Sequence, residues 1–396
     1  MTRRAHVPSY RQNLYSVANS TDPHPHYRRL RDLGPVVWLP RHRVYAITRY
    51  AECKEVLLDA TSFISGDGVG LNVLANRLGR DTTLNSDGED HARRRRLVAP
   101  RMTPRALGAM SEQIEEMAAE VVDAALAKGT VDGVADLARA LPLGVVPDLV
   151  GWPSDQREHL LRWAAATFDS LGPLNATSVR TMGSSLGMLR FARAIARGGD
   201  VLPGSLGDDA LKAVAAGTIS DKEGVALMID YLAPSLDTTI SGIASALHLL
   251  ATHPDQWSML RGNPTLVPNA VSEALRFETP IRGFTRRAAR EAEVGGITIP
   301  RGSRVLVLYA SANRDDLVFA DPDTFDITRD ASAQLAFGRG THSCAGQGLA
   351  RLETETLLRT LVDRVERIEP AGEPSWMRNN LIRCHRVLPL RLEARR

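Results

Sequence analysis

The segment AFGRGTHSCAGQGLARLE, from Ala336 to Glu353, places one cysteine where a glycine-rich loop changes into a helix-forming run. Glycines in such a loop let the backbone take positive φ angles and approach a flat ligand closely. Cys344 then faces the positive end of the helix and its free N–H groups, which lower the pKa of a thiol and stabilise the thiolate. A thiolate in this position suits a nucleophile, a zinc ligand or the axial ligand of haem iron.

Zinc is the weakest of these roles, because Cys53 and Cys384 offer no paired C-x-x-C spacing. A nucleophilic pair with a histidine stays open. His342 lies only two residues before Cys344, however, which suits a loop around a ligand better than a dyad. A buried structural thiol is the ordinary interpretation of a lone cysteine. The neighbouring phenylalanine, the glycines and the following helix together make it the poorer one here.

The composition excludes several classes of protein. Of 396 residues, 43% are hydrophobic and 24% charged, as is ordinary for a globular protein. The formal net charge is only +3, and no aromatic residues interleave with the basic ones, so we expect no nucleic-acid partner. Three cysteines cannot build a disulfide framework, which favours a reducing compartment. The N-terminus has no long apolar run, so we expect no membrane anchor and a cytoplasmic protein.

The apolar periodicity predicts a mainly α-helical protein with small β-sheets. Alternation predicts two strands, Val36–Leu39 and Val44–Thr48. The longest helical pattern runs from Val225 to about Ala251, and another helix covers about Leu266 to Phe277. No repeat, low-complexity linker or shift in composition marks a boundary, so we expect residues 1–396 to form a single domain.

The spacing Phe337-Gly338-x-Gly340-x-His342-x-Cys344-x-Gly346 resembles the haem-binding signature of the cytochrome P450 family. The resemblance implies the cytochrome P450 fold. It also implies haem b bound by this loop, with iron ligated by the Cys344 thiolate, whose electron donation favours O–O cleavage.

The sequence Glu273-Ala274-Leu275-Arg276 matches the Glu-x-x-Arg motif of the same family. Residues three apart share a helical face and can form an ion pair, although an ordinary solvated pair has the same spacing. In the family this pair stabilises the core behind the cysteine loop. The segments ANRD (312–315) and DPDTFDITR (321–329) also resemble the family and follow at the usual place.

The segment SDGEDHARRRRLV (86–98) resembles the family's Asp-Pro-Pro-x-His-x-x-x-Arg, with Gly88-Glu89 in place of Pro-Pro. The resemblance implies that His91 and Arg95 donate hydrogen bonds to the haem propionates, as charge-assisted donors do. Arg286 and His342 are implied as further donors to the same groups.

The long helix carries YLAPSLDTTISGI (231–243), which resembles the family's Ala-Gly-x-Asp/Glu-Thr segment. The resemblance implies that Asp237 and Thr238 deliver protons to bound dioxygen. A helix N-cap is the alternative role for Asp237, but the helix is expected to be already under way. Pro234-Ser235 replaces Ala-Gly; because proline has no N–H, the helix should kink there.

Several stretches are most similar to bacterial P450s that O-demethylate or hydroxylate para-substituted benzoates. Arg77 or Arg80 would supply the positive charge for a carboxylate. Asp230, however, stands where a serine is expected, and it would repel a carboxylate. Three alternatives follow. Asp230 pairs with Arg80, or Asp230 points outward, or the substrate is neutral or cationic. The candidate substrate-contacting residues are Val69, Leu71, Arg80, Phe168, Ile229, Asp230, Ala233, Ile281 and Phe284.

The leading hypothesis is a haem-thiolate monooxygenase. It would insert one oxygen atom from O2 into a small aromatic substrate by hydroxylation or O-demethylation. A separate ferredoxin and ferredoxin reductase would supply the electrons. Arg93, Arg94 and Arg96 form either a solvated basic face or a docking patch for the donor. One alternative is a P450 that tailors a natural-product scaffold by hydroxylation or oxidative coupling. The other is a non-catalytic haem protein that binds or senses a gas.

Overall fold

The computed structural model describes residues 7–153, 157, 159–198, 200–232 and 234–395. Helices dominate this part of the chain, as expected from the sequence. In chain order the α-helices are α1 (Val17–Thr21), α2 (His24–Leu33), α3 (Tyr50–Leu58), α4 (Val73–Leu78), α5 (Gly88–Val98), α6 (Pro104–Gly108), α7 (Ser111–Lys128), α8 (Ala140–Val150), α9 (Leu160–Leu171), α10 (Ala176–Ala196), α11 (Leu206–Ala215), α12 (Asp221–Leu232), α13 (Asp237–Thr252), α14 (Pro254–Gly262), α15 (Val267–Phe277), α16 (Tyr309–Ala312) and α17 (Gln347–Arg364).

The strands form small sheets, the largest with five strands. Its order is β1 (Val36–Leu39), β2 (Val44–Ile47), β8 (Arg304–Val307), β5 (Phe284–Ala288) and β3 (Phe63–Ile64). β1 and β2 form the predicted antiparallel pair, and β2 runs parallel to β8. The other strands are β4 (Thr130–Asp132), β12 (Pro389–Ala394) and β9 (Val365–Pro370) in one sheet, and the pairs β6 (Ala292–Val294) with β7 (Ile297–Ile299) and β10 (Ser375–Trp376) with β11 (His385–Val387).

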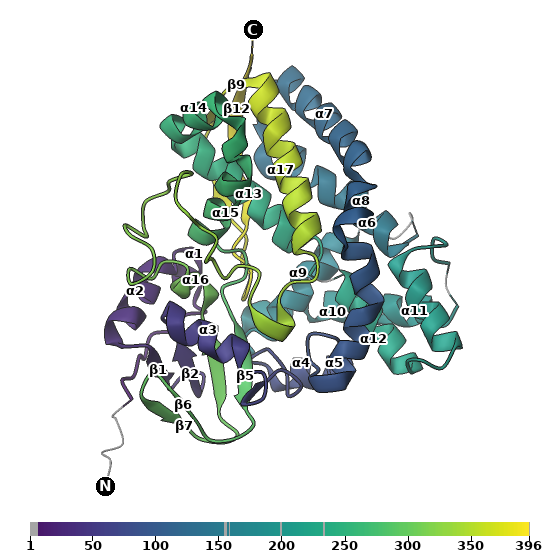
Figure 1. Ribbon diagram of the computed structural model, residues 1–396, viewed down its shortest axis with the longest axis vertical. Coiled ribbons are helices and arrows are strands. Elements are labelled where there is room, and N and C mark those ends of the chain that lie inside the picture. Colours follow the sequence, from purple (N-terminus) through teal and green to yellow (C-terminus); the bar gives the residue numbers. More distant parts are fainter. Residues whose placement is uncertain (1–6, 154–156, 158, 199, 233, 396) are drawn as a thin grey trace.

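Helix α13 lies in the centre of the molecule, with α15 and α17 beside it (Figure 1). Most of its residues are buried, as expected for a helix that is apolar on nearly all sides. The five-stranded sheet lies with α1, α2 and α3 at one corner, and α9, α10, α11 and α12 gather on the other side. The sheet region and the helical region therefore lie on different sides of the molecule.

The strand and helix predictions agree closely with the structure. The strand predicted over Val44–Thr48 is β2, which ends one residue earlier, at Ile47. The helix predicted from Leu266 to Phe277 is α15, preceded by a short 3-10 turn at Pro264–Leu266. No helix in the described ranges is both long and apolar enough to cross a membrane.

The single long helix predicted from Val225 to Ala251 is wrong. The structure has two helices, α12 ending at Leu232 and α13 beginning at Asp237. Pro234 cannot donate a backbone hydrogen bond, which explains why the helix is interrupted rather than only bent. Near the break, the Ser235 hydroxyl donates to the Tyr231 carbonyl (2.6 Å) and the Thr238 hydroxyl to the Pro234 carbonyl (2.7 Å). Asp237 consequently stands in the first turn of α13, where a carboxylate is favoured by the helix dipole.

The pair Glu273 and Arg276 on α15 is fully buried, so its interpretation as a solvated helix pair is wrong. The Arg276 guanidinium donates to both carboxylate oxygens of Glu273, at 2.6 and 2.8 Å. It also donates to the backbone carbonyls of Asn313 (2.9 Å) and Pro322 (2.8 Å). The pair thus connects α15 to the ANRD segment and the loop that follows it.

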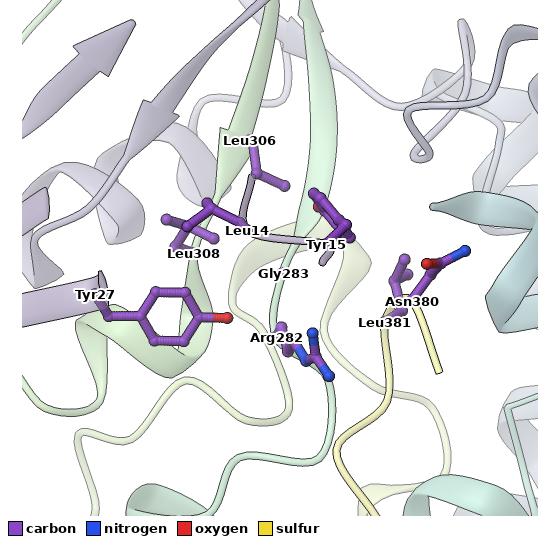
Figure 2. Close-up of a pocket in the computed structure, with 9 residues that line it drawn as sticks. All are labelled: Leu14, Tyr15, Tyr27, Arg282, Gly283, Leu306, Leu308, Asn380 and Leu381. Carbon is purple, nitrogen blue, oxygen red and sulfur yellow. The ribbon is translucent and has the colours of Figure 1, made fainter. Parts of the chain in front are cut away.

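A small cavity of about 10 Å³ lies where the N-terminal segment, β8 and the C-terminal loop meet (Figure 2). It has room for about one water molecule. The buried Arg282 guanidinium borders it and donates to the carbonyls of Ser20 (2.9 Å) and Asn379 (3.3 Å). Those bonds tie the N-terminal segment to the C-terminal loop. This cavity is too small for an organic substrate, so the functional site lies elsewhere.

Candidate functional site

A cavity of about 520 Å³ lies among α4, α5, α9, α10, α12, α13, β5 and the cysteine loop. Most side chains on its wall are apolar, and a few polar or charged groups are placed among them. This is the usual make-up of a site for an organic ligand. Four of the segments singled out above reach this cavity: the cysteine loop, the segment with His91 and Arg95, the segment with Thr238, and Arg286.

The cysteine loop brings Cys344 to the cavity wall. Gly338 and Gly340 have φ angles of 66° and 72°, which glycine adopts without strain. A side chain at Gly340 would come within 2.6 Å of the Leu57 carbonyl, so the loop packs tightly on α3. The Cys344 N–H donates to the Phe337 carbonyl (2.8 Å), which closes the loop, and α17 begins three residues after the cysteine.

The Cys344 side chain is enclosed by the protein, yet it keeps exposed surface because that surface faces the cavity. Burial raises the pKa of the thiol, while the N–H of Gly346, the Arg95 guanidinium and the N–H of Gln347 act in the lowering direction. The expected net lowering by the helix terminus is therefore wrong for the thiol alone, because desolvation is the larger effect. A bound metal cation deprotonates a ligating thiol.

Four basic side chains of the described residues line the same cavity: His91, Arg95, Arg286 and His342. The rings of His91 and His342 are 4.3 Å apart between centroids. Desolvation, with the nearby charges of His342 and Arg95, lowers the pKa of His91 to about 4. In the described part of the chain Arg95 has no ion-pair partner, and the only carboxylate near His342 is Asp87, at 3.8 Å from its Nε2.

These residues fit haem. The cavity offers a thiol for the iron, apolar walls for a flat ring, and two arginines and two histidines as hydrogen-bond donors for the two carboxylates. The nitrogen Nε2 of His342 is buried without a hydrogen-bond partner, as is expected of a donor whose acceptor belongs to a ligand. A side chain at Gly346 would meet no protein atom within 4 Å. Phe337 also lines the cavity.

Asp237 and Thr238, the acid and the alcohol at the start of α13, lie in different environments. Thr238 is on the cavity wall, whereas Asp237 is buried behind it and does not line it. Burial raises the pKa of Asp237 to about 7, partly opposed by Arg139 and reinforced by Asp169. Its Oδ2 atom has no hydrogen-bond partner. An acid with a pKa near neutrality is suited to exchange protons.

Glu353 of α17 is a cavity residue that the sequence analysis missed. Its carboxylate is buried, both oxygens lack hydrogen-bond partners, and burial raises its pKa to about 8. A signal was present in the sequence: Leu349, Glu353, Leu357 and Leu361 are spaced four apart and are all buried. A glutamate in an apolar helical stripe indicates an unusual environment.

Replacing Glu353 with glutamine is expected to reduce the pH dependence of stability. The folded-state pKa of Glu353 is above its value of about 4.3 in the unfolded chain. Its contribution to folding is therefore fully present below pH ~4 and is lost as pH rises towards 8, by up to about 1.4 kcal/mol per pH unit. Thermal unfolding of the haem-loaded protein from pH 5 to 9 measures this.

In that experiment, the advantage of Glu353→Gln over the wild type should grow with pH and then level off. Glu369→Gln is the control, because Glu369 is exposed on β9 and should leave the wild-type profile unchanged. Parallel profiles for wild type and Glu353→Gln would contradict the raised pKa.

Only some of the predicted substrate-contacting residues line the cavity. Val69 is buried in the core and is not among the residues that line the cavity. Leu71 packs against the cluster formed by α2 and the sheet, and Arg80 is exposed and off the wall, so these three predictions are wrong. Ala233 lies outside the described residues. The predicted residues that do line the cavity are Phe168, Ile229, Asp230, Ile281 and Phe284.

Comparisons with known proteins agree with this geometry. The family model described as Cytochrome P450 matches residues 205–382. The chain is 36% identical to Cytochrome p450 CYP199A2 of Rhodopseudomonas palustris, over 98% of this chain and 95% of the relative. It is 33% identical to 6-deoxyerythronolide B hydroxylase of Saccharopolyspora erythraea, over 93% and 95%. Among solved structures, epothilone D-bound cytochrome P450epoK is 30% identical with a TM-score of 0.84, over 97% of this chain and 99% of that one.

Proposed function

The chain belongs to the cytochrome P450 family and is a haem-thiolate monooxygenase, and we propose that it inserts one oxygen atom from O2 into a small aromatic substrate. The reaction would be hydroxylation or O-demethylation. When bound, the haem supplies the redox chemistry that activates O2. One observation supports the proposal most directly: the Cys344 thiol, the Thr238 hydroxyl and aromatic side chains all line the same cavity.

Several residues of this chain would bind the haem. Cys344 would ligate the iron, and His91, Arg95, Arg286 and His342 would donate hydrogen bonds to the haem carboxylates. Phe337 and Gly346 would border the ring.

On the substrate side, Phe168, Ile229, Ile281 and Phe284 would contact the aromatic ring, which apolar and aromatic side chains accommodate well. Asp237 would hold a proton close to the cavity, and the hydroxyl of Thr238 would pass that proton on. Similarity to benzoate-oxidising P450s supports a single para-substituted ring as the substrate scaffold.

We also propose that a separate ferredoxin and its reductase deliver the electrons and that the protein works in the cytoplasm. Cys53, Cys344 and Cys384 are all free thiols in the structure, which supports a reducing compartment. The basic run on α5 provides only part of the predicted docking surface, because Arg94 is buried and both Arg93 and Arg94 pair with Glu223.

Tailoring of a natural-product scaffold is the second candidate. Leu74, Leu78, Leu174 and Met182 line the cavity and are also exposed at the surface, so the cavity opens to solvent through an apolar rim. Such an opening would admit part of a larger apolar molecule. One relative, 6-deoxyerythronolide B hydroxylase, is named for such a scaffold.

Turnover with isotope-labelled O2 tests the proposal. The purified holoenzyme, supplied with a ferredoxin, its reductase and NADH, should add one labelled oxygen atom to para-substituted single-ring aromatics. Product from macrolide scaffolds alone would favour the second candidate. Gas binding without substrate oxidation under any of these conditions would overturn both and favour a sensor.

Replacing Thr238 with alanine is expected to uncouple electron consumption from product formation. The Thr238 hydroxyl is held at the cavity wall by its bond to the Pro234 carbonyl, and alanine removes it. Product formed per NADH consumed should fall about tenfold, the effect of one hydrogen-bonding group. Product and NADH are measured in the same reaction.

Thr252→Ala is the matched control for this experiment. Thr252 ends the same helix and makes the same bond to the carbonyl four residues earlier (2.8 Å to His248), but it lies away from the cavity. Equal coupling in Thr238→Ala and the wild type would remove Thr238 from proton delivery.

A further inference from the structure

We propose that Asp230 makes this cavity selective for small aromatic substrates that carry a protonated amine, and that it disfavours aromatic carboxylates. The proposal rests on the monooxygenase function proposed above and specifies the charge of the substrate. It follows from the position of Asp230, from its partners and from the other charges on the cavity wall.

Asp230 lies near the end of α12, two residues before Leu232, and lines the large cavity. It is only half-buried although it sits in the interior, because the surface that it retains faces the cavity. The Thr83 N–H donates to its Oδ2 atom, which anchors the carboxylate. A carboxylate fixed in this way presents a defined acceptor to a ligand.

The two other roles considered for Asp230 disagree with the structure. It does not point outward, since it lines the cavity, and Arg80 is exposed and off the wall. In the described ranges Asp230 has no ion-pair partner. Arg94 is close enough to stabilise its charge, but Arg94 is already paired with Glu223, at 3.0 Å between Nη2 and Oε1. The anchored carboxylate therefore lacks a cation of its own.

The remaining charges on the wall strengthen the argument. Within the described part of the chain, the cationic or potentially cationic wall residues are His91, Arg95, Arg286 and His342, all assigned to the haem carboxylates. An aromatic acid entering the cavity would find none of them free. The wall has one other carboxylate, Glu353, whose pKa is raised to about 8, whereas the pKa of Asp230 is raised only to about 6.

At neutral pH, then, Asp230 is ionised and Glu353 is mostly protonated. A bound carboxylate would add a second negative charge beside Asp230 in a low-dielectric space, which is unfavourable. A protonated amine would supply the missing partner. The Tyr231 hydroxyl, buried on the same wall without a hydrogen-bond partner, offers an additional polar contact. The apolar side chains of Ile229 and Phe168 remain available for the ring.

The test is a spin-state titration of the holoenzyme with three ligands that share one ring: para-methoxybenzylamine, para-methoxybenzyl alcohol and para-methoxybenzoate. At about pH 7 Asp230 is largely ionised, Glu353 is mostly protonated and a benzylic amine is protonated. We expect the amine to bind at least tenfold more tightly than the alcohol, and the carboxylate to bind most weakly. Asp230→Asn keeps the shape and removes the charge. It should weaken amine binding about ten- to hundredfold while leaving the alcohol nearly unchanged.

Asp221→Asn is the matched control, because Asp221 is an exposed carboxylate at the start of the same helix. It should leave all three affinities unchanged. Equal affinities, tighter binding of the carboxylate, or an unchanged amine preference in Asp230→Asn would overturn the selectivity and leave the monooxygenase function intact. If the reduced carbon-monoxide complex shows the thiolate band but none of the three ligands shifts the spin state, the small-aromatic function and its selectivity both fail. Absence of the band would overturn the monooxygenase itself.

Discussion

Serine in place of Cys344 is expected to abolish the thiolate-dependent band of the reduced carbon-monoxide complex and all monooxygenase turnover. A serine hydroxyl ionises far less readily than a thiol, so it does not provide the anionic ligand that the iron requires. The fold should survive, because the side chain faces the cavity and does not fill the core. The absorption spectrum of the reduced protein under carbon monoxide is the measurement, with circular dichroism to verify folding.

Cys53→Ser separates this effect from general damage by a cysteine-to-serine change. Cys53 is fully buried beside the five-stranded sheet, with its Sγ atom 3.3 Å from the Ile47 carbonyl. A serine hydroxyl can donate to the same carbonyl, so this variant should keep the band and its turnover. If Cys344→Ser kept the band, or Cys53→Ser lost it, Cys344 would not be the iron ligand.

The cysteine loop and its donors could be predicted from sequence because their geometry is local. The glycines, His342 and Cys344 fall within ten residues, and His91 and Arg95 stand four apart on one helix. Such spacings fix which side chains share a face before any tertiary contact forms. The structure places His91, Arg95, His342 and Cys344 on one cavity wall, whereas Gly340 packs against α3.

The residues that contact the substrate were harder to predict, since their orientation depends on how an irregular segment packs. Val69 and Leu71 belong to a stretch with no helical or strand periodicity, so the sequence does not tell which side chains point inward. The backbone of Val69 bonds to Asn85 and Thr285, and its side chain is buried in the core. The same limit applies to Arg80, whose charge suggested a role in binding but whose side chain is exposed.

Two further errors arose where local rules compete. Pro234 predicted a kink within one helix, whereas the structure has two helices, of which the first ends at Leu232. The helix terminus correctly favoured a thiolate at Cys344, but the sequence gives no measure of burial, which has the larger effect on its pKa. For Cys344 the missing quantity was the degree of enclosure.

Alanine in place of Glu273 is expected to cost about 3–5 kcal/mol of folding free energy. The side chains of Glu273 and Arg276 are completely buried, and removing the carboxylate leaves the guanidinium without its counter-charge. Arg329 also loses its partner, at 3.2 Å from Glu273, as does the Asp326 N–H, at 3.1 Å. Since typical domains have only 5–15 kcal/mol of stability, much of the protein should fail to fold and to retain haem. Haem incorporation per protein and the thermal midpoint measure the loss.

Glu273→Gln and Glu393→Ala make this prediction independent of whether the alanine variant can be purified. Glutamine keeps the hydrogen-bonding shape but not the charge, so its midpoint should fall between those of the wild type and the alanine variant. Glu393 pairs with Arg367 at 3.9 Å with both side chains more than half exposed, and its removal should change stability by less than about 1 kcal/mol. If Glu273→Ala were no more damaging than Glu393→Ala, the carbonyls of Asn313 and Pro322 alone would hold Arg276 in place. The buried carboxylate would then be dispensable, because a guanidinium satisfied by backbone acceptors would need no counter-charge there.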